Sequence, residues 1–295
     1  MSLTRAYHGH TIRAQDGLAL FVRNYAPAPG TPQKPTLLCL AGIARHSGDF
    51  DDLAQRYAAR GHRVIAPDYR GRGASARDPD PSRYRPEVYL DDLRHCLVAL
   101  DCGAVIAIGS SMGGLLTMAM GVAMPPRLLG AVLNDIGPDI EAAGMGRIAD
   151  YLGANTSYAN WSEAVAALKQ LSPGLNPGPG LEAREADWQK VADNSFVEGP
   201  DGRLHPHWDP AIAVPLKNGD PIPDLWPLFN SLRAVPTLAL RGGASDIFSA
   251  NGLARMARAH PTMRHITLAH KGHTPSLDEP ESLEAIDALI ADIVG

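Results

Sequence analysis

One stretch of this chain decides its fold: residues 104–120 read AVIAIGSSMGGLLTMAM. Its first five residues are apolar, which is typical of a buried strand, and the residues after Gly114 are typical of a helix. Between them, a glycine-flanked turn holds Ser111 at its centre. A strand, turn and helix in this order raise one hydroxyl above the edge of a sheet and direct the backbone amide of the next residue toward the reacting carbonyl. Ser111 is therefore the first candidate functional residue.

This stretch resembles the serine-dependent α/β-hydrolase superfamily, in particular its capped, esterase- and lactonase-like branch. The catalytic residues of that superfamily follow one another as Ser, Asp or Glu, and His. The resemblance implies Asp246 as the acid, in the turn after the apolar residues 237–240. It implies His273 as the base, in the loop after residues 265–269. Asp135 is the alternative acid, because it follows the strand after the elbow and some members recruit their carboxylate there.

The chemistry of acyl transfer explains this set of residues. A serine hydroxyl is a poor nucleophile until an imidazole takes its proton, and a carboxylate fixes the tautomer of that imidazole. The developing oxyanion needs two N–H donors, for which we expect the backbone amides of Met112 and Ile43. The commonest pattern has His-Gly where this chain has Ala41-Gly42. Arg45 or His46 either replaces the contacts of that imidazole, touches the substrate, or is a solvated loop residue.

The remaining pattern predicts an α/β fold with a mostly parallel, doubly wound sheet. Two short strands joined across Asp16-Gly17 predict an entry hairpin, and strands then alternate with helices, which requires crossover connections. The alternation stops between about residues 138 and 226. We therefore expect a core of residues 1–137 and 227–295, with a helical cap inserted at 138–226. The four tryptophans lie in or beside this insertion, either as a substrate wall or as the core of the cap.

Composition excludes several classes of protein. The net charge is −5 and basic runs are lacking, so we expect a small-molecule substrate and neither a nucleic-acid nor a membrane partner. Residues 1–11 have no apolar centre, so we expect a cytoplasmic protein, and Cys39, Cys96 and Cys102 are expected to be reduced thiols. The sequence predicts no oligomeric state.

Two further motifs carry little weight. Residues 71–76 match a dinucleotide-binding fingerprint, but Arg77-Asp78-Pro79-Asp80-Pro81 follows and cannot open a helix. The group His205, His207 and Asp209 has metal-ligand residue types but no further ligands nearby. We therefore expect neither a cofactor nor a metal.

Together these patterns predict a hydrolase that cleaves a small carboxylic ester or lactone through an acyl-enzyme on Ser111. Carbon–carbon bond hydrolases of aromatic degradation are an alternative, because they share the Ser-Met-Gly-Gly run at residues 111–114 but often carry tryptophan where this chain has Thr274. A non-catalytic small-molecule receptor on the same fold is the second alternative.

Overall fold

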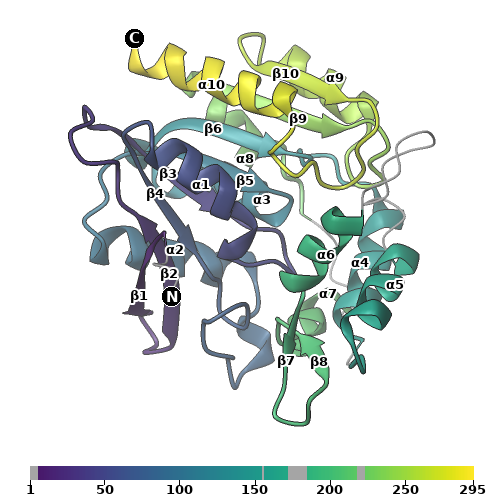
Figure 1. The fold of residues 1–295 in the computed structure, drawn as a ribbon. Helices are drawn as coiled ribbons and strands as arrows, with labels where there is room; N and C mark the ends of the chain where they lie inside the picture. Colours follow the sequence, from purple (N-terminus) through teal and green to yellow (C-terminus); the bar gives the residue numbers. More distant parts are fainter. Residues whose placement is uncertain (1–5, 155, 172–184, 218–222) are drawn as a thin grey trace.

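The computed structural model describes residues 6–154, 156–171, 185–217 and 223–295. Its centre is an eight-stranded sheet with the order β1-β2-β4-β3-β5-β6-β9-β10 (Figure 1). The strands are β1 His8–Arg13, β2 Ala19–Tyr25, β3 Lys34–Leu40, β4 His62–Pro67, β5 Val105–Ser110, β6 Leu128–Asn134, β9 Thr237–Gly242 and β10 Arg264–Leu268.

The pairing of the strands is mostly parallel, as predicted. β2 runs antiparallel to both β1 and β4, and the pairs from β4 to β10 are parallel. The predicted entry hairpin is present, and Gly17 adopts a φ of +85° in its turn. Residues 105–108 of β5 are fully buried. Their unbroken apolar run follows from this position, because a central parallel strand is covered on both faces.

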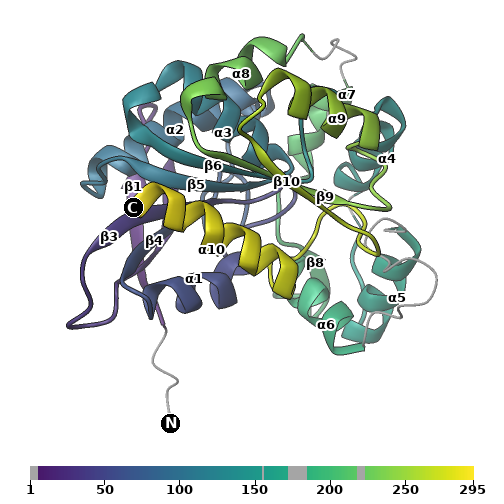
Figure 2. The ribbon, with the colours of Figure 1, turned by 90° about the horizontal axis from the view of Figure 1, so that it is seen from above.

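Helices cover both faces of the sheet. α1 (Asp51–Ala58) and α10 (Pro280–Val294) lie on one face, as Figure 2 shows. The opposite face carries α2 (Pro86–Ala99), α3 (Met112–Ala123), α8 (Trp226–Asn230) and α9 (Ala250–Ala259). α10 presents Ile286, Leu289 and Ile290 to the sheet, which matches its helical spacing of apolar residues.

The described residues between β6 and α8 add no strand to this sheet. They form α4 (Ala142–Leu152), α5 (Trp161–Leu171), α6 (Glu185–Asp193), a hairpin of β7 (Phe196–Glu198) and β8 (Leu204–Pro206), and α7 (Val214–Lys217). These elements gather at one end of the molecule (Figures 1 and 2). Trp188 and Trp208 are buried there, whereas Trp161 is exposed.

The strand order determines which loops can meet. β3 pairs with β4 on one side and with β5 on the other, so the chain reverses its direction of winding at β3. The carboxyl ends of strands at such a switch point leave a crevice where ligands bind in open α/β sheets. The loops after β3, β5, β6, β9 and β10 all leave this edge.

Candidate active site

Ser111 occupies a sharp turn between β5 and α3. Its φ is +51° and its ψ is −115°, a conformation that is uncommon for a residue with a side chain. The turn needs glycine on both sides because the backbones nearly touch. A Cβ on Gly113 would lie 2.0 Å from the carbonyl oxygen of Leu40, and one on Gly109 would lie 2.3 Å from that of Gly113. The sequence thus forces the tight turn that lifts the Ser111 hydroxyl.

A continuous chain of hydrogen bonds connects Ser111 to a histidine and a carboxylate. Nε2 of His273 lies 2.9 Å from Oγ of Ser111, and Nδ1 of His273 lies 2.7 Å from Oδ2 of Asp135. The other oxygen of Asp135 accepts a hydrogen bond of 2.7 Å from the backbone N–H of Gly242. Asp135 has no exposed surface, and the His273 side chain is 8% exposed. With Nδ1–H donated to Asp135, Nε2 is free to accept the Ser111 proton.

The expectation that Asp246 contacts His273 is wrong. The Asp246 carboxylate instead pairs with the guanidinium of Arg147 on α4, at 2.6 and 3.0 Å. Asp135 lies beside His273 instead. It follows β6, which lies between β5 and β9 in the sheet. Its φ of +57° is part of the turn that carries its side chain to His273.

Asn134 is a site residue that the sequence analysis missed. Its Nδ2 donates to Oγ of Ser110 at 2.9 Å and to the carbonyl oxygen of Pro275 at 2.9 Å. It therefore links the elbow to the loop that carries His273, and it is fully buried. The sequence signal that could have identified Asn134 is an amide side chain at the end of an otherwise apolar strand.

The two expected N–H donors flank Ser111. Met112 opens α3, and Ile43 lies in the loop after β3, residues 41–46. Across the described residues, neither backbone N–H donates to a protein acceptor. A Cβ on Gly42 would lie 3.8 Å from Cβ of Ser111, so this loop passes close to the serine. Both amides remain predictions for an oxyanion hole.

The 41–46 loop also contacts the 138–226 segment. Arg45 is held by both oxygens of Asp49 at 2.6 Å and donates to Oγ of Ser195, which follows α6, at 2.6 Å. His46 Nδ1 accepts from the N–H of Gly48, so its Nε2 faces Nδ1 of His207 at 3.1 Å. Both residues have protein partners, and neither is a freely solvated loop residue.

Burial sets the protonation of this histidine pair. Burial, together with the charge that a protonated His46 would place nearby, lowers the pKa of His207 to about 4. Burial also lowers the pKa of His46 below its usual value. The contact between His46 and His207 is therefore neutral near pH 7.

The residues of the suspected metal group have separate partners. His205 pairs with Asp201, His207 faces His46, and Asp209 accepts from the hydroxyl of Tyr84. Within the described ranges, no three His, Cys, Asp or Glu residues are grouped as a metal site would require.

The three cysteines are free and buried. Burial raises the thiol pKa of Cys96 to about 12, and the pKa values of Cys39 and Cys102 are raised for the same reason. A buried thiol that holds its proton is not a nucleophile.

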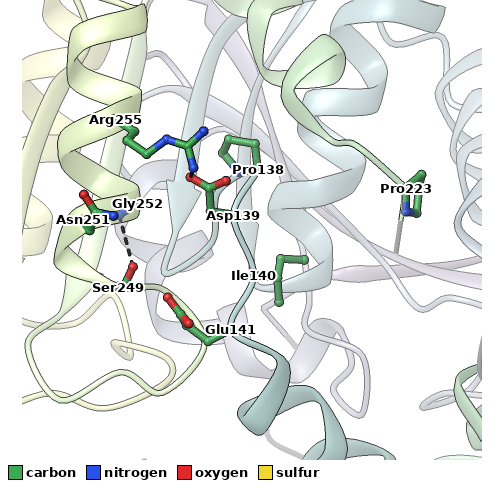
Figure 3. A pocket seen from close by; sticks show the side chains of 9 residues that line it. All are labelled: Pro138, Asp139, Ile140, Glu141, Pro223, Ser249, Asn251, Gly252 and Arg255. Atoms are coloured by element: carbon green, nitrogen blue, oxygen red, sulfur yellow. Dashed lines mark hydrogen bonds and ion pairs between the residues drawn. The ribbon is translucent and has the colours of Figure 1, made fainter. Parts of the chain in front are cut away.

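A pocket of about 370 Å³ lies beside the start of α9 and does not include Ser111, His273 or Asp135. Figure 3 shows Arg255 reaching from α9 toward Asp139, with Ser249 and Gly252 at the start of the helix. Its lining residues are Pro138, Asp139, Ile140, Glu141, Pro223, Ser249, Asn251, Gly252 and Arg255. Because Arg255 and Asp139 neutralise each other at 2.9 Å, the pocket offers no unpaired charge from these two groups.

Comparison with known proteins identifies the family. The model of the α/β hydrolase family matches residues 37–286, which include every strand from β4 to β10 and the Ser111, Asp135 and His273 positions. The chain belongs to the α/β hydrolase family. Its fold is the α/β-hydrolase fold, as the sequence predicted, and its relatives support a hydrolase.

Several known proteins resemble most of the chain. The 3-hydroxybutyrate-oligomer hydrolase of Cupriavidus necator is 29% identical over 262 residues, which cover 86% of this chain and 88% of that protein. The 2-(acetamidomethylene)succinate hydrolase of Mesorhizobium japonicum is 26% identical and covers 87% of this chain and 88% of that protein. The crystal structure of an α/β hydrolase from Novosphingobium aromaticivorans is 38% identical, with a TM-score of 0.89, over 98% of this chain and 99% of that chain.

A membrane-crossing helix is not found in the part of the chain that the structure describes, since no helix there combines the needed length with apolar composition.

Proposed function

We propose that this α/β hydrolase is a serine hydrolase that cleaves a small carboxylic ester or lactone. The observation that carries the proposal is the hydrogen-bonded chain from Ser111 Oγ through His273 to the buried Asp135, at 2.9 and 2.7 Å. This is the relation of nucleophile, base and orienting acid that acyl transfer requires.

In the proposed reaction, Ser111 Oγ attacks the ester carbonyl carbon while His273 Nε2 takes its proton. Asp135 holds the imidazole in the correct tautomer and stabilises its charged form. The N–H groups of Ile43 and Met112 stabilise the negative charge on the carbonyl oxygen. His273 then gives its proton to the leaving alcohol, and a water molecule activated by His273 releases the acid from Ser111.

We propose that the 138–226 segment is a cap that covers this site. Its support is that the described residues of the segment add no strand to the sheet. The segment also contacts the 41–46 loop through the Arg45–Ser195 and His46–His207 pairs. A cover that excludes water strengthens the electrostatic interactions of the site.

The similarity to the Cupriavidus necator protein supports an ester as the substrate class of this chain. The name of that protein specifies an oligomer of 3-hydroxybutyrate. Units of a hydroxy acid are joined by ester bonds, so short oligoesters of this kind are our first candidate substrate class.

A substrate screen of the purified protein tests the proposal. Short 3-hydroxybutyrate oligomers, aryl acyl esters, lactones and vinylogous diketones are offered to the wild type and to Ser111→Ala. We expect ester or lactone turnover that Ser111→Ala abolishes, and covalent labelling of Ser111 by a phosphonate ester. Turnover of the diketone alone supports carbon–carbon bond hydrolysis instead. Folded wild type without turnover of any class or phosphonate labelling supports a receptor.

A further inference from the structure

The turn that resembles a dinucleotide fingerprint has a different role in this fold. Gly71 begins that turn, and no helix begins within the described residues 74–80 that follow it. The turn is part of residues 68–75, here called the bracket. The bracket packs against the 41–46 loop, whose Ile43 N–H we expect to hold the oxyanion.

Three consecutive carbonyl oxygens of the 41–46 loop each accept one hydrogen bond. The donors are Tyr69 Oη to Ala41 at 3.3 Å, Arg45 N to Gly42 at 3.1 Å, and Arg72 Nε to Ile43 at 2.8 Å. Two of the three donors belong to the bracket. With the peptide planes on both sides of Ile43 held, its N–H has a fixed direction.

The carboxylate of Asp68 completes the attachment of the bracket. One of its oxygens accepts from the N–H of Ser47 at 2.7 Å, just after the loop, and the other accepts from the N–H of Ala74 at 2.9 Å. Asp68 is 2% exposed. The bracket therefore holds both the middle and the end of the loop.

Arg72 is a buried arginine whose guanidinium is not paired with a carboxylate among the described residues. Arg72 is 1% exposed, and its hydrogen bonds go to Ile43 O, Arg70 O and Tyr89 Oη, each at 2.8 Å. None of these acceptors is a carboxylate, and within the described ranges Arg72 forms no ion pair. Its guanidinium also lies 4.8 Å from the centre of the Tyr89 ring.

Arg70, two residues earlier and equally buried, shows the contrast. Its guanidinium pairs with the carboxylates of Asp16, Asp78 and Asp92 at 2.5 to 2.8 Å. Three carboxylates surround this single guanidinium, so its positive charge is more than balanced where it lies. Arg72 keeps its positive charge next to the 41–46 loop, in surroundings where charges interact more strongly than in water.

We propose that Arg72 is a positioning residue for the oxyanion hole, which rests on the proposed serine-hydrolase function. It holds the Ile43 carbonyl so that the Ile43 N–H is aimed at the oxyanion before the reaction starts. Its unneutralised charge favours the same negative oxygen. Because preorganised donors act on the tetrahedral state and little on bound substrate, Arg72 should affect kcat and not KM.

The test compares Arg72→Gln, Arg72→Lys and the matched control Tyr89→Phe. Tyr89→Phe removes a hydroxyl that contacts Arg72 Nη1 but leaves the bond from Nε to Ile43. For each folded variant, kcat, KM and the inhibition constant of a trifluoromethyl ketone are measured with one ester. The ketone forms a tetrahedral oxyanion adduct with Ser111, so its affinity reports the oxyanion hole directly.

Removing one oxyanion-hole donor outright costs about 10²- to 10³-fold in kcat, so an indirect effect should be smaller. We expect Arg72→Gln to lower kcat by about 10- to 100-fold, to weaken ketone inhibition by a similar factor and to leave KM within about threefold. Arg72→Lys keeps the charge without the Nε geometry and should fall between Arg72→Gln and wild type. Tyr89→Phe should stay within about threefold in all three quantities.

Unchanged ketone affinity in a folded Arg72→Gln variant overturns the proposal. A loss of kcat and ketone affinity in Tyr89→Phe equal to that in Arg72→Gln also overturns it. If Arg72→Gln does not fold, Arg72→Lys decides: wild-type kcat and ketone affinity in that variant overturn the proposal. A wild-type protein that neither turns over esters nor binds the ketone contradicts the serine-hydrolase function itself, so the two failures are distinguishable.

Discussion

β6 and β9 lie side by side in the sheet, and each is followed by a turn that carries an aspartate. Asp135, after β6, is fully buried, and its two oxygens face His273 and the N–H of Gly242. Asp246, after β9, has 39% of its side chain exposed and faces Arg147. A buried carboxylate without an arginine keeps its charge available to an imidazole, whereas the Arg147 guanidinium already neutralises Asp246.

The comparison between the two turns also shows what each one supports. The Asp135 turn contacts the histidine loop through His273 and through the neighbouring Asn134, which donates to the carbonyl of Pro275. The Asp246 turn contacts α4 in the 138–226 segment. We therefore infer that the first turn serves the chemistry and that the second attaches the segment to the core.

The largest effect should come from the nucleophile. The kcat that remains without it is the baseline with which the kcat values of both aspartate variants are compared. Ser111→Ala should lower kcat by about 10⁶-fold, as loss of a serine nucleophile does when the rest of a triad remains. Ser110→Ala is the matched control, because the Ser110 hydroxyl is held by Asn134 and not by His273. Steady-state kinetics with one ester measures kcat of both variants. A loss of kcat in Ser110→Ala as large as that in Ser111→Ala would show that the assignment of Ser111 as the nucleophile is wrong.

The second effect separates the two aspartates directly. Asp135→Asn should lower kcat by about 10⁴-fold, because an amide opposite Nδ1 favours the wrong imidazole tautomer. Asp246→Asn should lower kcat by less than about tenfold. Both variants are first checked for native circular dichroism, and kcat is then measured with the same ester. The reverse ranking would return the acid to Asp246.

Sequence alone predicted the fold because its signals are local. Residues 104–120 require a strand, tight turn and helix, and the long apolar runs of β5 and β6 require a sheet covered on both faces. Ser111 was predicted from the same local signal and His273 from the resemblance, and in the structure His273 Nε2 lies 2.9 Å from Ser111 Oγ. The family model and the strand pairing confirm the fold class.

The acid could not be chosen in this way because both Asp135 and Asp246 lie in a turn that follows a strand of the sheet. Asp135 follows β6 directly, and Asp246 lies four residues after the last residue of β9, Gly242. Closeness to a strand does not decide between them, since His273 lies five residues after Leu268. The deciding contacts are between residues far apart in the sequence. The N–H of Gly242 donates to Asp135, and the guanidinium of Arg147, about 100 residues away in sequence, pairs with Asp246.

The third effect concerns the stability of the Asp246 turn. Arg147 and Asp246 are 31% and 39% exposed, so solvent screens their attraction. A double-mutant cycle with Arg147→Gln and Asp246→Asn, followed by urea denaturation, should give a coupling energy of about 0.5 to 1 kcal/mol. A coupling energy near zero would mean that this pair does not attach the segment to the core.

A pH-dependent effect concerns the second contact of the segment with the core, His46 with His207. The pKa of His207 is about 4 in the folded protein because of burial, against about 6.5 in an unfolded chain. The unfolded state thus binds more protons between these values, and the free energy of unfolding should fall as pH falls from about 6.5 to 4. In His207→Gln this decline should be shallower. Equal slopes for both proteins, by urea denaturation across this range, would contradict a buried neutral His207.

The central claim is that the imidazole Nδ1–H of His273 donates to Asp135, at 2.7 Å. Proton NMR of the folded protein at low temperature, with ¹⁵N-labelled histidine, observes this proton as a far-downfield imidazole resonance. We predict that the resonance is lost in His273→Ala, is lost or strongly shifted in Asp135→Asn and is unchanged in Asp246→Asn. A resonance that persists unchanged in Asp135→Asn and disappears in Asp246→Asn would contradict the account.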